Sequence, residues 1–135
     1  MENNVFVIDG DTSARIGLQR LLIAAGHKVE GYSSVHEFLG SIGKIGSGCL
    51  VLDSAIGGVW GTRLLDELSK RNIKLSMIVI SADYNQEDRK KADEMKAVGF
   101  FHKPVDGQAL LDAIEWSLRS GNKSNDRKKT YHDDS

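Results

Sequence analysis

The sequence predicts an α/β fold, a doubly wound parallel sheet covered by helices on both faces. Short apolar runs alternate with amphipathic segments five times along the chain, which is the order typical of repeated strand–helix units. The connections are too long for hairpins, so successive strands are expected to be parallel and joined by right-handed crossovers. Three of the runs end abruptly in a polar residue, namely Asp9, Asp53 and Ser81. Polar groups are therefore expected to gather at one edge of the sheet.

The five strands are predicted from short apolar runs bounded by glycine, proline or polar residues. The fourth run is almost entirely apolar, as in strands that are covered on both faces. The second is a weaker candidate because it contains Gly31. The run that ends at Asp53 contains Cys49, which we interpret as a small buried hydrophobic residue. The expected strands are residues 5–9, 28–32, 49–53, 75–80 and 100–103.

The five helices are predicted from capping residues and from apolar residues at helical spacing. Ser34 and Glu37 form a capping box, Asp106 caps the last helix, and Gly26 ends the first. The fourth helical segment, residues 85–98, is mostly charged, so we expect a thin buried stripe and low local stability. The apolar faces of the other helices contain Leu18, Leu21 and Leu22; Phe38, Leu39 and Ile42; Leu64, Leu65 and Leu68; and Leu111, Ile114 and Leu118.

These units predict a five-stranded parallel sheet of order 2-1-3-4-5, a flavodoxin-like (βα)5 architecture. Its topological switch point lies between the first and third strands, which end in Asp9 and Asp53. Ligands of open α/β sheets bind at that point. Residues 1–121 are expected to form one domain. Residues 122–135 have almost no apolar content, so they are interpreted as a polar tail or a truncated linker.

Composition restricts the classes of function. With 40% hydrophobic and 27% charged residues among 135, the chain is typical of a globular protein in water. A net charge of −1 argues against direct binding to nucleic acid or to a membrane surface. No apolar run is long enough to span a membrane, and the amino terminus has no basic, signal-like region. A single cysteine excludes an internal disulfide, so a cytoplasmic location is expected.

Five features occur in register with the predicted elements. They are Asp9 after the first strand, Asp53 after the third, Gly61 at the start of the third helix, Ser81 after the fourth strand and Lys103-Pro104 after the fifth. Together they resemble the receiver domains of two-component response regulators, over about residues 4–120. The run from Tyr32 to Leu39 is also similar to receivers that are joined to a C-terminal helix-turn-helix output domain. That DNA-binding domain would lie outside this chain.

The resemblance implies a signalling domain rather than an enzyme. Asp53 would be the phosphoacceptor and would attack the phosphohistidine of a sensor histidine kinase. Lys103 would neutralise the transferring group, Ser81 would hydrogen-bond the acyl phosphate, and Phe100 would turn inward as Ser81 moves. The added negative charge would change the surface of the fourth helix, fifth strand and fifth helix, where we expect a homodimer or an output partner. Weak self-dephosphorylation would be tuned by Ala55 and Asp83.

A divalent cation is expected between Asp9 and Asp53. Two carboxylates about 4 Å apart repel by about 4 kcal/mol at an effective dielectric constant of 20, and Mg²⁺ suits such hard oxygen ligands. The resemblance adds the backbone carbonyl of Ala55 as a metal ligand. Gly10 stands where the family has a second acid that binds the metal directly. Asp11 is the candidate replacement, since a glycine before it permits an unusual backbone path; otherwise the metal is bound more weakly.

Alternative functions remain open. Gly10 favours a degenerate receiver, an interaction module that acts without phosphorylation because its metal site is weak. The sequence Asp9-Gly10-Asp11 also resembles the nucleophile motif of haloacid-dehalogenase-type phosphatases, with Asp9 as nucleophile and Asp11 as general acid. That family needs a later acidic motif after a strand, and the late pair here, Asp133-Asp134, lies in the predicted tail. The family's usual proline after Asp53 is replaced by Gly57, so we expect a mobile loop there.

Overall fold

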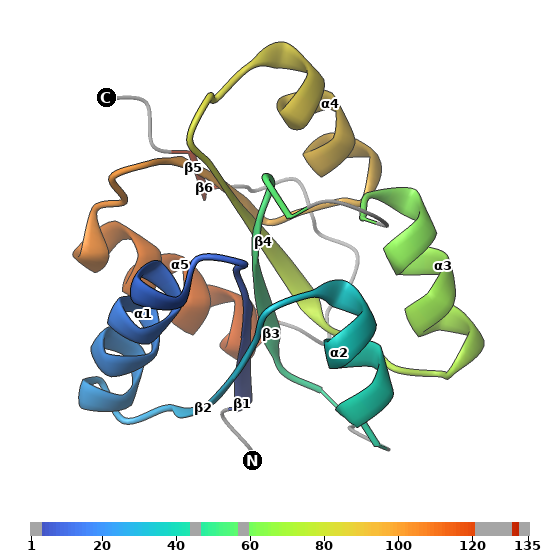
Figure 1. The fold of residues 1–135 in the computed structure, drawn as a ribbon, viewed down its shortest axis with the longest axis horizontal. Helices are drawn as coiled ribbons and strands as arrows, with labels where there is room; N and C mark the ends of the chain where they lie inside the picture. Colours follow the sequence, from blue (N-terminus) through green and yellow to red (C-terminus); the bar gives the residue numbers. More distant parts are fainter. Residues whose placement is uncertain (1–3, 44–46, 57–59, 121–130, 133–135) are drawn as a thin grey trace.

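A parallel sheet with helices on both faces forms the centre of the structure (Figure 1). The structure is a computed structural model that describes residues 4–43, 47–56, 60–120 and 131–132. Its strands are β1 (Asn4–Ile8), β2 (Lys28–Tyr32), β3 (Cys49–Asp53), β4 (Ser76–Ser81), β5 (Gly99–His102) and β6 (Tyr131–His132). Its helices are α1 (Thr12–Ala24), α2 (Val35–Ser41), α3 (Thr62–Lys70), α4 (Gln86–Glu94) and α5 (Gly107–Ser120).

The predicted doubly wound sheet is confirmed. The strands run in the order β2-β1-β3-β4-β5-β6, and all of the pairings are parallel. Helices α1 and α5 cover one face, and α2, α3 and α4 cover the other (Figure 1). Because every strand before β6 is followed by a crossover helix, the carboxyl ends of β1, β3, β4 and β5 share one edge.

The edge of the sheet carries a strand that the sequence pattern did not predict. Tyr131 and His132 form β6, which pairs with Gly99 and Phe100 of β5. Both residues belong to the segment interpreted as a polar tail. Apart from β6, that segment lies outside the described residues. The five predicted strands therefore stand, and a short sixth extends the sheet beyond β5.

Two apolar cores form on opposite faces of the sheet because successive side chains of a strand point in opposite directions. In β3, Leu50 and Leu52 pack on the face of α2, α3 and α4, whereas Cys49 and Val51 pack against α1 and α5. Cys49 is fully buried, as predicted, and burial raises the pKa of its thiol to about 12. The thiol therefore stays protonated and behaves as an apolar group.

Side-chain caps fix where the helices begin. Ser34 Oγ accepts a hydrogen bond from Glu37 N at 3.0 Å, and Asp106 Oδ1 accepts one from Gln108 N, also at 3.0 Å. Both residues thus act as caps as predicted, but the return bond expected of the capping box differs, since Glu37 Oε1 accepts from Ser33 N at 2.7 Å. Gly61 precedes α3 with φ of 83°, a left-handed conformation that favours glycine. These caps set the helix starts that follow the carboxyl edge of the sheet.

Helix α4 is shorter than the predicted segment of residues 85–98. It ends at Glu94 because Lys96 adopts a left-handed backbone with φ of 60°, and the chain then turns into β5. Ala92 is the buried residue within α4, which confirms the expected thin apolar stripe. In the parts of the chain that the structure describes, no helix has the length and apolar character needed to cross a membrane.

Candidate functional site

Three charged side chains meet at the carboxyl edge of the sheet, and we call them the charged cluster: Asp9 after β1, Asp53 at the end of β3 and Lys103 after β5. Lys103 Nζ lies 2.8 Å from Asp53 Oδ2 and 3.7 Å from Asp9 Oδ2. The first distance is a charge-assisted hydrogen bond, and the second is too long for one. The structure therefore brings together three of the residues that the sequence predicted for one site.

Asp9 is the most buried member of the charged cluster, with 1% of its surface exposed. Its Oδ1 accepts a hydrogen bond from Asp11 N at 2.9 Å, whereas Oδ2 is buried without a hydrogen-bond partner. Burial raises the pKa of Asp9; the Asp11 hydrogen bond opposes this effect, and the charge of Asp53 reinforces it. A carboxylate oxygen in this condition favours a nearby cation.

Both carboxylate oxygens of Asp53 accept hydrogen bonds. Oδ2 accepts the Lys103 hydrogen bond, and Oδ1 accepts one from Ala55 N at 2.9 Å. Burial lowers the pKa of Lys103, but the hydrogen bond and charge of Asp53, together with the charge of Asp9, raise it by more. Lys103 therefore remains an ammonium, which keeps a fixed positive charge beside the Asp53 carboxylate.

Ser81 lies at the end of β4 and is fully buried, but its hydroxyl does not bond to the charged cluster. Ser81 Oγ donates to Asp88 Oδ2 of α4 at 2.8 Å and accepts a hydrogen bond from Tyr84 N at 2.6 Å. The structure thus places Ser81 at the predicted edge and directs its hydroxyl toward α4. Sequence reasoning missed Asp88, because the charge run of α4 gave no sign of a partner inside the fold.

Phe100, the other predicted switch residue, is 3% exposed and already lies in the core. Its ring stacks on Tyr84 with centroids 5.0 Å apart, and Arg89 Cζ lies 5.6 Å from the ring centroid. Tyr84 also stacks on His102 at 4.9 Å. The turn before α4 is therefore attached to β5 by aromatic contacts. Asp83, the residue expected to tune dephosphorylation, is exposed in this turn.

The candidate metal ligands of this edge are two carboxylates, Asp9 and Asp53, and Asp9 Oδ2, which has no hydrogen-bond partner, fits a divalent cation. In the described ranges, no group of three or more histidine, cysteine, aspartate or glutamate side chains is arranged to hold a metal. Mg²⁺ commonly uses one or two carboxylates and keeps several waters, so two carboxylates suffice for a weak site. Ala55 follows Asp53 closely, as a carbonyl ligand would need to. The loop around Gly57 lies outside the described residues.

Asp11 has a structural role. Its Oδ1 caps α1 by accepting hydrogen bonds from Ser13 N at 2.9 Å and Ala14 N at 3.3 Å. Gly10 is exposed, and its backbone is not in the left-handed region, so it does not take the unusual path that the sequence analysis considered. The Asp11 carboxylate is therefore directed to the helix, and its use as a metal ligand stays a prediction.

Replacing Asp11 with alanine is expected to lower the free energy of unfolding by about 1 kcal/mol, because an N-cap is lost. Urea denaturation measures this change. If the carboxylate serves only as a cap, Asp11→Ala leaves the affinity for Mg²⁺ within about twofold of wild type, a difference of only a few tenths of a kcal/mol. A loss of tenfold or more would instead show that Asp11 contributes to the metal site.

A cavity of about 620 Å³ opens beside the charged cluster. Lys103 and Asp9 form its polar side, and apolar residues of α1 and of the segment after β5, including Leu18, Leu21 and Val105, form the remainder. The cluster is therefore reached from the side of α1, over a partly apolar surface.

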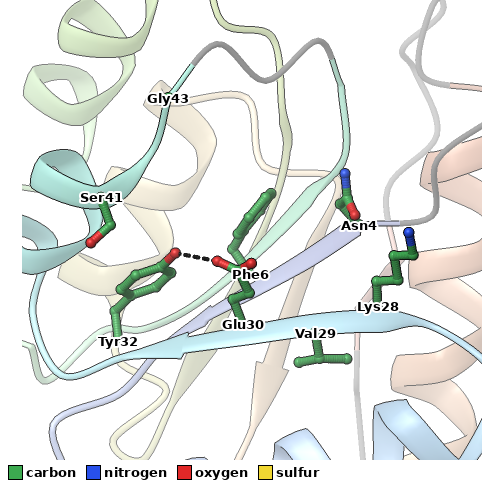
Figure 2. Close-up of a pocket in the computed structure, with 8 residues that line it drawn as sticks. All are labelled: Asn4, Phe6, Lys28, Val29, Glu30, Tyr32, Ser41 and Gly43. Carbon is green, nitrogen blue, oxygen red and sulfur yellow. Dashed lines mark hydrogen bonds between the residues drawn. The ribbon is translucent and has the colours of Figure 1, made fainter.

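A second cavity, of about 340 Å³, lies between β1, β2 and α2 and contains no member of the charged cluster (Figure 2). Tyr32 Oη donates a hydrogen bond to Glu30 Oε1 at 2.7 Å along its wall. Burial and this bond raise the pKa of Tyr32 well above its usual range. The phenol of Tyr32 therefore stays neutral at neutral pH.

The sequence of this chain is similar to a family model and to known regulatory proteins. The family model described as response regulator receiver domain matches residues 5–115. The transcriptional regulatory protein TdiR of Thauera aromatica is 33% identical over 131 residues, which are 94% of this chain and 58% of TdiR. The transcriptional regulatory protein FixJ of Azorhizobium caulinodans is 32% identical over 114 residues, 84% of this chain and 54% of FixJ. The chain thus spans little more than half the length of these relatives.

Solved structures of response regulators are also similar to this chain in fold. The structure of full-length FixJ from B. japonicum has a TM-score of 0.78 and 26% identity, and the match covers 89% of this chain and 59% of that one. The response regulator StyR has a TM-score of 0.69 and 35% identity, over 91% of this chain and 62% of that one. Both matches again involve only a part of the longer protein.

Proposed function

Because the chain belongs to the response regulator receiver domain family of two-component systems, we propose that Asp53 accepts a phosphoryl group from the phosphohistidine of a sensor histidine kinase. The supporting observation is the charged cluster. Asp53 lies at the carboxyl edge with Lys103 Nζ 2.8 Å from one carboxylate oxygen and with buried Asp9 nearby. This arrangement provides a nucleophile and a fixed positive charge at a place where negative charge would develop.

In the proposed reaction, a carboxylate oxygen of Asp53 attacks phosphorus, the bond from phosphorus to the histidine nitrogen breaks, and the released imidazole takes up a proton. Lys103 orients the carboxylate and neutralises the phosphoryl oxygens. Asp9, Asp53 and the carbonyl of Ala55 would hold Mg²⁺, which would supply further positive charge to the same oxygens. The chain thus acts as a signalling domain, and slow hydrolysis of the acyl phosphate would return it to the resting state.

The partner kinase would approach over α1. The cavity beside the charged cluster opens between α1 and the segment after β5, and its wall includes the apolar residues Leu18, Leu21 and Val105. A phosphohistidine carried on a partner surface with apolar residues could enter there and reach Asp53. Such kinases present their histidine in the cytoplasm, so we place this chain in the same compartment.

The output would be transcriptional. TdiR and FixJ are transcriptional regulatory proteins nearly twice as long as the matched segment, so we propose that this chain is the receiver part of a similar regulator. The DNA-binding output domain would be supplied outside the present sequence. The face formed by α4, β5 and α5 is the proposed contact, either with that domain or with a second receiver in a homodimer.

A degenerate receiver is the second candidate, because Gly10 and the capping role of Asp11 leave two carboxylates for a metal. The phosphatase alternative has less support, since the Asp11 carboxylate is directed to the start of α1 and not toward a reacting group beside Asp9.

The intact mass after incubation with acetyl phosphate and Mg²⁺ tests the proposal. Wild type should gain one phosphoryl group, and Asp53→Asn should gain none, because the amide is not a nucleophile for phosphorus. Asp9→Asn should react more slowly because it loses one carboxylate of the metal site. Absence of any adduct on folded wild type would favour the phosphorylation-independent module. Turnover abolished by Asp9→Asn but kept by Asp53→Asn would revive the phosphatase.

A further inference from the structure

Ser81 is attached to α4 by a partly buried hydrogen bond to Asp88, and this bond would oppose the proposed switch. Ser81 Oγ donates to Asp88 Oδ2 at 2.8 Å. We propose that Asp88 is a regulatory residue whose carboxylate keeps the Ser81 hydroxyl away from Asp53 and holds the amino end of α4 in the resting arrangement. This inference rests on the proposed phosphorylation of Asp53, since the acyl phosphate would be the competing acceptor.

The competition follows from the chemistry of the hydroxyl. A serine hydroxyl has one hydrogen to donate, and in this structure Asp88 receives it. The oxygen also accepts a hydrogen bond from Tyr84 N at 2.6 Å. Phosphoryl oxygens at Asp53 can only accept a hydrogen bond from Ser81. Ser81 therefore cannot bond to the phosphoryl group without releasing Asp88, and the bond that must break is charge-assisted.

Breaking that bond would affect α4 because few apolar side chains attach this helix to the fold, although Arg89 and Lys91 also lie over the rings of Phe100 and Trp60. Asp88 lies in its first turn, next to the cap formed by Asn85, and Ala92 is the buried residue of α4. Segments with few buried apolar contacts open at low free-energy cost. The Ser81–Asp88 bond is therefore one of a small set of contacts between α4 and the rest of the fold, together with buried Ala92 and the two cation–π contacts.

Ser81 is also connected to β5, because Tyr84 contacts both. The amide of Tyr84 donates to Ser81, and its ring stacks on Phe100 and His102. Tyr84 also has φ of 52°, a left-handed conformation that is unfavourable for a residue with a side chain, so its turn depends on the surrounding contacts. If the Ser81 hydroxyl turned away from Asp88, the position of the Tyr84 turn would change. The surface formed by α4 and β5 would then change as well.

The first measurement needs no phosphoryl donor. Amide hydrogen exchange of Tyr84 is compared in wild type, Asp88→Ala and Glu87→Ala. The control, Glu87, is exposed in the same turn of α4 and carries the same charge. Loss of the Asp88 acceptor is expected to speed exchange of the Tyr84 amide by about fivefold, the effect of one hydrogen bond, whereas Glu87→Ala stays within about twofold. Unchanged exchange in Asp88→Ala would overturn the inference.

The second measurement separates a regulatory role from a structural one. With acetyl phosphate and Mg²⁺, Asp88→Ala is expected to form the Asp53 adduct about fivefold faster than wild type, because Ser81 is already free to bond the phosphoryl group. Asp88→Asn, which keeps an acceptor oxygen, should lie between the two. In a Ser81→Ala background, Asp88→Ala should have no further effect on the rate. An equal effect in that background would show that Asp88 only stabilises α4 and would refute the proposal.

These measurements also distinguish this inference from the proposed function. If wild type and all variants form no adduct, the phosphorylation of Asp53 is disproved, and with it the competition proposed for Ser81. Exchange at Tyr84 would still show whether Asp88 holds the turn. If the adduct forms but Asp88→Ala changes neither exchange nor rate, only the role of Asp88 is disproved.

Discussion

Replacing Lys103 with methionine is expected to slow formation of the Asp53 adduct by about 100-fold to 1,000-fold. Lys103 Nζ is 2.8 Å from Asp53 Oδ2, so it is the positive charge nearest the proposed nucleophile among the contacts of Asp53. Removing one such preorganised donor from a site where charge develops typically costs this much in rate. Methionine keeps an unbranched apolar side chain of similar length, so the change removes mainly the charge. The initial rate of adduct formation by intact mass measures the effect.

The same substitution is expected to lower the free energy of unfolding by about 3 kcal/mol without Mg²⁺. It leaves Asp9 and Asp53 buried together without their common cation, and breaking a buried ion pair from one side costs about 3–5 kcal/mol; partial exposure of Lys103 favours the lower value. The pKa of Lys103 is raised in the folded state, so its stabilising effect is fully present below the ordinary lysine pKa and is lost only at alkaline pH. Urea denaturation at neutral pH therefore measures the full contribution of the Lys103 charge to the free energy of unfolding.

The control for Lys103→Met is Lys74→Met. Lys74 is an exposed lysine between α3 and β4, so its replacement removes the same charge without touching the charged cluster. The free energy of unfolding should change by less than about 0.5 kcal/mol. Adding Mg²⁺ should recover part of the stability of Lys103→Met, because a bound cation stabilises the folded state. Wild-type stability and a wild-type adduct rate in Lys103→Met would contradict the electrostatic role of Lys103.

The fold and the charged cluster could be predicted from sequence because they depend on regular features. Apolar runs with polar ends define strands, and parallel strands bring their carboxyl ends to one edge whatever the details of packing. Asp9 and Asp53 each follow such a run directly, and Lys103 follows one after a single intervening residue, His102. Their meeting is therefore a consequence of topology, and the structure confirms it.

The orientation of the Ser81 hydroxyl could not be predicted in the same way. It depends on which acceptor lies within hydrogen-bond distance, and Asp88 is seven positions further along, inside a run of charges that reads as a solvated surface. The role of Asp11 depends similarly on local geometry, since an aspartate after a strand serves equally as a helix cap or as a ligand. Strand β6 was missed because Tyr131 and His132 lie in a polar context and pair through backbone atoms, which leave no side-chain pattern.

The capping role of Asp11 bears directly on the affinity of the site for Mg²⁺. Asp11 caps α1, Lys103 lies between the two remaining carboxylates, and Asp9 Oδ2 has no hydrogen-bond partner. A site with two carboxylates and a competing ammonium should bind Mg²⁺ weakly. An acidic residue in place of Gly10 is the single change expected to raise that affinity most.

Replacing Gly10 with aspartate is therefore expected to tighten Mg²⁺ binding by about 10-fold to 100-fold, an effect at least as large as that of typical supporting residues in metal sites. The position accepts a side chain. A Cβ at Gly10 would meet only the Ser33 carbonyl oxygen, at 3.8 Å, and the backbone there is not left-handed. Without Mg²⁺, the added carboxylate should destabilise the protein by about 1 kcal/mol through repulsion from Asp9 and Asp53, because it lies at the surface.

The sign of the stability change should consequently reverse with metal. Urea denaturation of Gly10→Asp and wild type with and without Mg²⁺ measures this reversal, and isothermal titration calorimetry measures the affinity directly. Gly40→Asp is the matched control: Gly40 lies in α2, is exposed and has open space around it, so it receives the same charge far from the charged cluster. Equal Mg²⁺ affinities for Gly10→Asp and wild type would mean that a third carboxylate at this edge does not reach the cation, and that the weakness of the site arises from Lys103 rather than from the glycine.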